Sequence, residues 1–307
     1  MFKIHSILLT NNEADILAEC IDSALKWSDY IYIFDTGSTD KTLEIINSFT
    51  LSHTNIILYK SEYRLYNFTK NISEVFSYYF KNSSIGDWWC TLCTDEQYPE
   101  DPRIFLAKVP LFYNNVLSNT LNYYFTENEL KIINQDPKLS ANDFSKIKYS
   151  LFLKYYKNNY SEVRFYRHYK NTFHDTLLIP KNFKYTSPNK ITLQHFQYRS
   201  PSQIISRVRS RLKIYDQDKL KQFKHEFYFT LDDNGFHSFK NIHLNELDFA
   251  NITDSEILKS RIIDSSKLNY DNKDNKFIFN FNSNNYLYKM IIILKSLIIN
   301  LNFLKKY

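Results

Sequence analysis

The stretch "YIYIFDTGSTDKT", residues 30–42, places an apolar run directly before a turn of acidic, hydroxylic and glycine residues. The run at 30–34 is rich in residues that favour β-strands, and Thr39 or Asp40 is suited to cap a helix that begins just after it. A strand that leads into a helix through a short turn is the building unit of a parallel sheet. This stretch therefore predicts an α/β fold with a polar turn at the end of a strand.

The same alternation runs through the first hundred residues. The expected strands are 3–10, 30–34, 55–60 and 88–92, and the expected helices are 11–27, with Asn11 or Asn12 as its cap, 41–49 and 67–80. Parallel strands joined by right-handed crossovers bind ligands beyond their carboxyl ends. Polar clusters follow three of the strands, at 11–13, 35–38 and 94–96, so we expect them along one edge of the sheet. The chain has no G-x-G-x-x-G motif and no P-loop.

The rest of the chain is less regular. We expect a helix over 101–118, a strand with a turn over 121–130, a polar loop over 134–148, strand and loop over 162–180, a strand over 190–196, and a basic helix over 200–223 capped by Ser200. The predicted domains are a catalytic domain at 1–225 and a C-terminal extension at 226–307. The apolar, lysine-interrupted run at 286–307 suits a helix at a membrane surface, or a helix packed on the domain or a partner subunit.

Composition bounds the class of protein. The 307 residues are 43% hydrophobic and 23% charged, which is enough to bury a core. The net charge of +6 is mild and no basic block is dense, so we expect no nucleic-acid partner. The excess of positive charge suits an anionic substrate or an anionic membrane surface. Three cysteines and an N-terminal apolar run too short for a secretory signal favour the cytoplasm.

The stretch "WWCTLCTDEQ", residues 88–97, contains a C-x-x-C followed by two carboxylates. It is open to interpretation as a redox pair, half of a zinc site, or a buried strand that ends in a turn. Cys90 and Cys93 are three residues apart on a strand and so point to opposite faces, which is poor geometry for a disulfide. A buried strand is favoured, and Asp95 and Glu96 then lie where a side chain reaches a ligand.

The stretch at 10–45 resembles the opening of family-2 glycosyltransferases of the GT-A fold, which read N-E-E, a helix, and a strand ending in D-S-G-S-T-D-x-T. "NFTKNISEVF" resembles the family's F-x-x-x-R-N helix, "WWCTLCTDE" its strand ending in D-x-D-E, "VRFYRHYKNTFHD" its R-x-F-R…H-E segment, and "LQHFQYRSPSQ" its H-x-x-Y-R-S-x-x-Q segment. The resemblance covers about the first two thirds of the chain. It implies a Rossmann-like, mostly parallel central sheet flanked by helices, with a C-terminal helical extension.

The resemblance also implies roles for individual residues. Asp95 would hold Mn²⁺ or Mg²⁺, with His195 as a second metal ligand. Asp175 would be the catalytic base, with Glu96 or Asp143 as alternatives. The donor would be bound by Asn12, Glu13, Asp35, Gly37, Ser38, Lys70, Asn71 and Arg164. For Arg164, and for Arg167 beside it, a salt bridge is an equal alternative. The first Asp of D-x-D is Cys93 here, which weakens the metal assignment.

The function that follows is an inverting, metal-dependent glycosyltransferase that uses a nucleotide-sugar donor, with a UDP-sugar expected. The expected acceptor is a bacterial surface glycan or glycolipid, such as a lipopolysaccharide core or capsule precursor, on the inner face of the membrane. Two alternatives stay open. One is a nucleotide-sugar-binding protein with weak or no activity, which Cys93 motivates. The other is a protein glycosyltransferase, because acceptor sites lie on variable loops.

Overall fold

The computed structural model describes residues 2–64, 67–141, 144, 147–159, 161–168, 185–214 and 253–272, with the side chains of 211–214 left aside. The chain divides into two compact units. Among the described residues, the first contains those within 1–119 and 161–193, and the second contains those within 120–160 and 194–274. The predicted boundary at 225/226 lies outside the described residues and stays a prediction.

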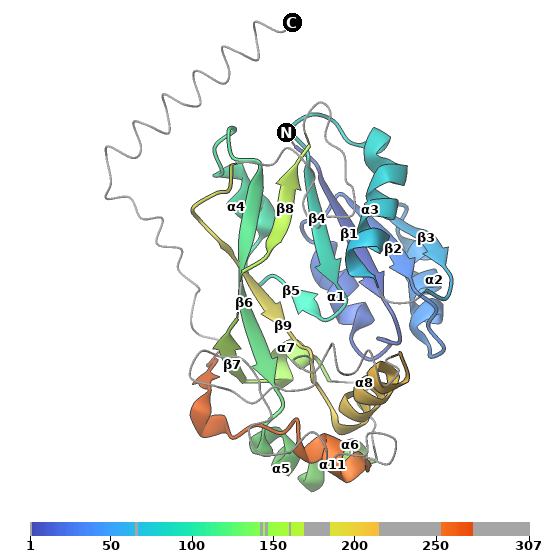
Figure 1. The fold of residues 1–307 in the computed structure, drawn as a ribbon, viewed down its shortest axis with the longest axis vertical. Helices are drawn as coiled ribbons and strands as arrows, with labels where there is room; N and C mark the ends of the chain where they lie inside the picture. Colours follow the sequence, from blue (N-terminus) through green and yellow to red (C-terminus); the bar gives the residue numbers. More distant parts are fainter. Residues whose placement is uncertain are drawn as a thin grey trace, which may run out of the picture. The chain divides into compact units, whose positions relative to one another are not determined.

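The first unit is built on a mixed sheet whose order, from one edge to the other, is β6-β8-β4-β1-β2-β3 (Figure 1). Its strands are β1 (Ile4–Thr10), β2 (Tyr30–Asp35), β3 (Ile56–Ser61), β4 (Trp88–Cys93), β8 (Val163–Arg167) and the first part of β6 (Asn115–Tyr124). β1 pairs in parallel with β2 and β4, and β2 pairs in parallel with β3. β8 is antiparallel to β4 and to β6. The short β5 (Glu96–Gln97) pairs with β9 (Ile191–His195).

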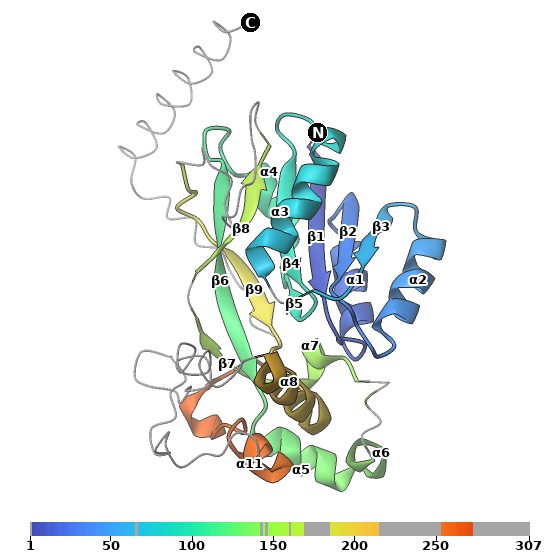
Figure 2. The ribbon, with the colours of Figure 1, turned by 45° about the vertical axis from the view of Figure 1, so that its right-hand side comes forward.

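Helices cover both faces of the parallel strands. They are α1 (Leu17–Ala24), α2 (Thr42–Ser52), α3 (Phe68–Tyr79), which runs into a 3-10 turn (Phe80–Asn82), and α4 (Pro102–Ala107). Because side chains alternate along a strand, β1 supplies Leu8 to a core shared with α1 and α2, and Ile7 to a core shared with α3. Figure 2 shows α3 on one side of these strands and α1 and α2 on the other. The predicted α/β fold, with a central sheet flanked by helices, is therefore confirmed.

Two predicted helices are shorter than expected. The first begins at Leu17, not at residue 11, because Asn12 adopts a left-handed backbone with φ 53° that a helix does not accept. Neither asparagine caps it. The predicted helix over 101–118 ends at Ala107, and the strand β6 begins at Asn115. Pro110 lies between them and cannot donate the backbone bond that a continuing helix needs.

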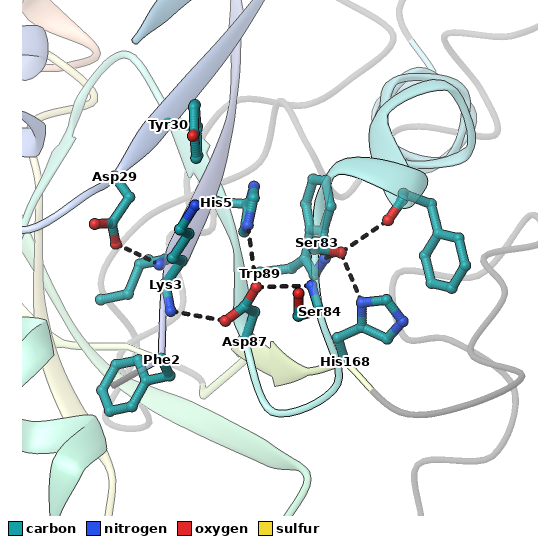
Figure 3. A network of polar contacts seen from close by, with 12 residues as sticks. Phe2, Lys3, His5, Asp29, Tyr30, Ser83, Ser84, Asp87, Trp89 and His168 are labelled. Atoms are coloured by element: carbon teal, nitrogen blue, oxygen red, sulfur yellow. Dashed lines mark hydrogen bonds and ion pairs between the residues drawn. The ribbon is translucent and has the colours of Figure 1, made fainter.

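The amino end of β1 is joined to that of β4 by the buried Asp87 and to that of β2 by the half-buried Asp29 (Figure 3). Asp87 accepts hydrogen bonds from the Lys3 and Ser84 backbone N–H groups, both at 2.8 Å. Asp29 accepts from the Ile4 N–H at 2.7 Å. These carboxylates satisfy strand-end donors that have no further strand to pair with.

His5 lies beside this cluster, fully buried, and stacks on Tyr30, Tyr32 and Trp89. Burial lowers its pKa from 6.5 to about 4, against the opposing pull of Asp87. Between these values the unfolded chain is protonated at His5 and the folded chain is not. Proton binding to His5 therefore favours the unfolded state. The stability that the neutral, buried His5 contributes at neutral pH is lost as the pH falls from 6.5 to 4.

A His5→Phe variant is expected to gain stability relative to the native protein as the pH falls, by up to about 3 kcal/mol between pH 7 and pH 4. Phe keeps the ring stack and cannot be protonated. Glu100 opposes His5 in the native protein, because burial raises its pKa to about 7. Its contribution cancels in the difference between the two proteins. Urea unfolding of both at pH 7, 5.5 and 4.5 measures that difference, and a difference that does not change with pH would contradict the prediction.

The second unit combines the end of β6 with short helices. Its elements are α5 (Glu127–Gln135), α6 (Pro137–Ser140), α7 (Tyr149–Phe152), β7 (Tyr155–Asn158), α8 (Pro201–Ile214), α11 (Asp254–Lys259), a 3-10 turn (Ser265–Lys267) and β10 (Asn269–Tyr270). β7 pairs antiparallel with β6 and with β10. The helix α8 begins after Ser200, whose Oγ accepts from the Gln203 N–H at 3.3 Å, so its predicted cap is confirmed.

In the described part of the chain, no helix has the length and apolar character needed to span a membrane. The predicted C-terminal helix at 286–307 lies outside the described residues.

Candidate active site

The three polar clusters predicted after the strands do meet at one edge of the first unit. β1 lies between β2 and β4, with Thr10 opposite Asp35 on one side and Leu9 opposite Cys93 on the other. The Oγ1 of Thr36 donates to the Thr10 carbonyl at 3.1 Å, and the Oγ1 of Thr94 donates to the Leu9 carbonyl at 3.0 Å. These hydroxyls fasten the carboxyl ends of the three strands to one another.

Asp35 is the centre of hydrogen bonding at this edge. It is fully buried, and its Oδ1 accepts from the Ser38 N–H at 3.1 Å and from the Ser38 Oγ at 2.5 Å. Its Oδ2 accepts from the Ser61 Oγ at 2.7 Å. A buried carboxylate needs such donors, because burial of an unpaired charge is costly. Asp35 thereby fixes the turn that follows β2 and joins it to the end of β3.

Asn12 joins the turn after β1 to the turn after β2. Its Oδ1 accepts from the Thr39 and Asp40 N–H groups at 2.7 and 3.3 Å, and its own N–H donates to the Ser38 Oγ at 2.8 Å. The next residue, Glu13, donates its N–H to the buried Thr42 Oγ1 at 3.0 Å. The two stretches that resemble the family, around Asn12 and around Asp35, are thus joined by direct hydrogen bonds. Asn12 holds the turn from 38 to 40 by these bonds.

Gly37 allows a close approach within the same edge. Its φ is +96°, and a Cβ built on it would lie 2.6 Å from the Cα of Tyr63. The segment after β3 lies against it because Glu62 donates its N–H to the Asp35 carbonyl at 3.1 Å, and Arg64 donates to the Thr36 carbonyl at 3.3 Å. This is a position where the backbone requires glycine.

Asp95 and Glu96 follow β4 directly and are both buried, at 4% and 2% exposure. Glu96 pairs with Arg164 of β8, its Oε1 lying 2.6 Å from the Arg164 Nη2. Its Oε2 accepts from the Cys93 N–H at 2.9 Å. Burial alone would lower the pKa of Arg164, but the charge of Glu96 and other acidic neighbours raises it above its usual value. The salt bridge that was an alternative for Arg164 is present in the structure.

The cysteines of the C-x-x-C are free thiols on different faces of β4. Cys90 is fully buried in the core beneath α1, whereas Cys93 is partly exposed. Burial raises the pKa of both thiols, and the charge of Glu96 raises that of Cys93 further. Neutral thiols are poor metal ligands and poor nucleophiles, so this pair behaves as part of a strand.

The metal assignment can be tested against the residues present. Within the described ranges, no group of three or more His, Cys, Asp or Glu side chains is placed to hold a metal ion. Asp95 offers one carboxylate, and Cys93 occupies the position of the other. Mg²⁺ is commonly held by one or two carboxylates with the remaining ligands from substrate phosphates and water. Among the described residues, Asp95 therefore fits a cation whose other ligands come from a diphosphate and water.

The other predicted residues are more scattered. Lys70 is exposed and Asn71 is buried, both in the first turn of α3, which Asn67 caps by accepting from the Lys70 N–H at 3.0 Å. The amide nitrogen of Asn71 has no hydrogen-bond partner within the described residues. His195 belongs to the second unit, where its Nδ1 lies 2.9 Å from the Asn122 Oδ1. Asp175 and Asp143 lie outside the described residues.

Sequence reasoning missed Ser61 and Thr42. Ser61 ends β3 and donates to Asp35, but the third strand was expected to end one residue earlier. A hydroxyl at the end of the strand next to that of Asp35 was the available signal. Thr42 is the last residue of the stretch that resembles D-S-G-S-T-D-x-T, but no role of its own is predicted for it from the sequence. Its hydrogen bond with the Glu13 N–H joins residues 29 apart in the sequence.

Residues 7–104 match the model of the family described as Glycosyl transferase family 2. No curated protein matches the chain. The match lies within the first unit and includes the three strand ends with Asp35 and Asp95.

Several solved structures are similar to parts of the chain. Two are of S. aureus TarS: one at 16% identity covers 41% of this chain and 22% of that one with a TM-score of 0.30, and TarS 1–349 in complex with UDP, at 17% identity, covers 41% and 37% with 0.29. A third is the mannosyltransferase PcManGT from Pyrobaculum calidifontis in complex with GDP-Man and Mn²⁺, at 12% identity, covering 69% and 62% with 0.35.

The chain thus spans less than two thirds of the length of each of these three structures. Because these TM-scores are low, the functional interpretation rests on the match to the family model. Residues 7–104 match the glycosyl transferase family 2 domain, and this match supports a glycosyltransferase.

Proposed function

We propose that this protein transfers a sugar from a nucleotide-sugar donor to an acceptor hydroxyl, with inversion at the anomeric carbon. The observation that carries the proposal is the edge of the first unit. There the family-matched residues place Asp35 at the end of β2 and the turn that contains Asp95 after β4, on either side of the parallel strand β1. Ligands bind at this edge of such sheets. A UDP-sugar is the proposed donor.

The two ends of the donor need different groups. Asp35 and the turn it fixes would contact the nucleoside, where an acceptor oxygen recognises the N–H of a base. Asn71, whose buried amide nitrogen has no hydrogen-bond partner in the part of the chain that the structure describes, would serve the same ligand, because a buried unpaired N–H is costly unless a ligand accepts from it. Asp95 would hold Mg²⁺ or Mn²⁺, which when bound neutralises charge on the leaving diphosphate. His195 stays a predicted second ligand.

An acceptor hydroxyl is a weak nucleophile at neutral pH, so a carboxylate must take its proton as it attacks. Asp175 remains the proposed base. The proposed acceptor is a bacterial surface glycan or glycolipid at the inner face of the membrane. The mild excess of positive charge supports an anionic substrate or surface, such as a lipopolysaccharide core or a capsule precursor.

A catalytically silent nucleotide-sugar-binding protein is the second candidate, and Cys93 in place of a metal-binding carboxylate favours it. Both candidates would bind the nucleotide sugar, but only the transferase would turn it over. A protein acceptor would be a third outcome of the same assays.

Calorimetric titration of UDP, GDP and CDP, with and without Mn²⁺, tests the proposal first. We expect one nucleotide to bind with Mn²⁺ and to bind at least about tenfold more weakly without it, because the diphosphate charge is then uncompensated. The expected nucleotide is UDP. Folded protein that binds none of the three would exclude the transferase and the silent binder alike. Nucleotide binding without turnover on any glycan, glycolipid or peptide acceptor would favour the silent binder.

A further inference from the structure

The turn after β4 is held by an ion pair that the proposed chemistry does not need. Glu96 and Arg164 have side chains that are only 1% and 7% exposed, and their closest atoms lie 2.6 Å apart. The same Arg164 Nη2 lies 2.8 Å from the Oε2 of Glu162, which is 29% exposed. One guanidinium therefore joins an inner and an outer carboxylate, with the inner one directly after Asp95.

Glu96 also closes the turn on itself. Its second oxygen accepts from the backbone N–H of Cys93, three residues earlier, at 2.9 Å. Thr94, which lies between them, is tied to β1 through its hydroxyl, which donates to the Leu9 carbonyl at 3.0 Å. Asp95 thus lies between Thr94, whose hydroxyl is bonded to β1, and Glu96, whose carboxylate is bonded to the backbone of Cys93. Its backbone has little freedom to move while both are intact.

A buried ion pair of this kind is weak evidence for stability. Removing two charges from water costs about as much as their attraction returns, and apolar replacements of similar size are often neutral or stabilising. Fixed geometry is a better reason for keeping it. A group that acts on a ligand must be held within about 0.5 Å of its productive position by the contacts of its neighbours.

We propose that Glu96 and Arg164 are positioning residues that fix Asp95 for its ligand, and that Glu96 does so instead of acting as the catalytic base. Both oxygens of Glu96 are engaged, by Arg164 and by Cys93, and the Nη2 of Arg164 contacts two carboxylates. The inference rests on the proposed function for the role of Asp95. The rigidity of the turn does not depend on it.

Glu96→Gln is the sharpest test, and Glu162→Gln is its matched control. Arg164 and the Cys93 N–H each use a different oxygen of Glu96, and Gln replaces one of these oxygens by an NH2 group, which would face a donor with another donor. The control makes the same change at the outer carboxylate of the same guanidinium. In the nucleotide-free protein, amide hydrogen exchange of residues 93–97 is expected to rise by about tenfold or more in Glu96→Gln and by less than about twofold in Glu162→Gln.

Kinetics separate positioning from a purely structural role. We expect kcat of Glu96→Gln to fall by about 10- to 100-fold and the Mn²⁺ concentration for half-maximal rate to rise, with KM for the acceptor unchanged. Arg164→Lys, which keeps the charge, is expected to retain more kcat than Arg164→Met. Exchange of 93–97 that does not change in Glu96→Gln overturns the inference, and so does faster exchange with native kcat.

Two further outcomes are decided in advance. If the native protein binds no nucleotide, the proposed function fails, whereas the exchange measurement still decides whether the pair holds the turn. If Glu96→Gln does not fold, the double variant Glu96→Leu/Arg164→Met removes both charges together. In that variant, loosened exchange with reduced kcat supports positioning, and native kcat overturns it.

Discussion

Asp95→Asn is expected to lower kcat/KM for sugar transfer by on the order of 10³ while the protein stays folded. Asn has nearly the shape of Asp but no charge, so a developing charge on the leaving diphosphate would lose its compensation through the bound cation. Asp95 is only 4% exposed and lies in a turn tied to β1, so the substitution leaves its surroundings in place. Initial rates at saturating Mn²⁺ and calorimetric nucleotide binding measure the effect.

Asp87→Asn is the matched control. Asp87 is 5% exposed and precedes β4, at the end opposite to Asp95, where it accepts two backbone N–H bonds. The introduced amide keeps one acceptor oxygen, so the control lowers the melting temperature and leaves kcat/KM within about threefold. Native rates in Asp95→Asn would remove Asp95 from the mechanism. Equal loss of rate in both variants would show that burial of a carboxylate, and not its position, accounts for the effect.

The parallel half of the fold follows from local pattern. The run at 30–34 and its neighbours are strongly apolar, and each is followed by a polar turn and a helical period, so the parallel strands and their shared edge could be expected. The strand that replaces the second half of the predicted helix over 101–118 could not be expected, because tertiary pairing of β6 with β8 draws Asn115 and the residues after it into a strand. Strand pairing over about fifty residues of sequence leaves no local signal.

The sequence predicts which types of residue lie at the site, but not which residues form hydrogen bonds and ion pairs with one another there. Asp35 at a strand end is visible in the sequence, but Asn12 holding the turn from 38 to 40 is not, since the bond joins residues 27 apart. Glu96 illustrates the limit most clearly. Adjacent carboxylates look equivalent in a sequence, and only Arg164, which is 68 residues away, distinguishes them.

Gly37→Ala is expected to destabilise the protein by about 3 kcal/mol or more and to weaken nucleotide binding. Two effects add. A φ of +96° strains any residue with a Cβ, and here the Cβ would lie 2.6 Å from the Cα of Tyr63, which is backbone and cannot rotate away. The turn after β2 or the segment after β3 must then shift. Asp35 accepts bonds from both through Ser38 and Ser61, so its position would change with them.

Gly86→Ala separates the two effects. Gly86 has nearly the same φ, +98°, but a Cβ there meets nothing within 4 Å. This control should cost only the backbone strain, about 1–2 kcal/mol, and leave nucleotide binding as it is in the native protein. Urea unfolding and calorimetry on the two variants give the comparison. A larger loss in Gly37→Ala, with binding affected there alone, assigns the close approach of Tyr63 to the site. Equal losses with native binding in both would mean that this edge tolerates the shift and that Gly37 serves only the backbone.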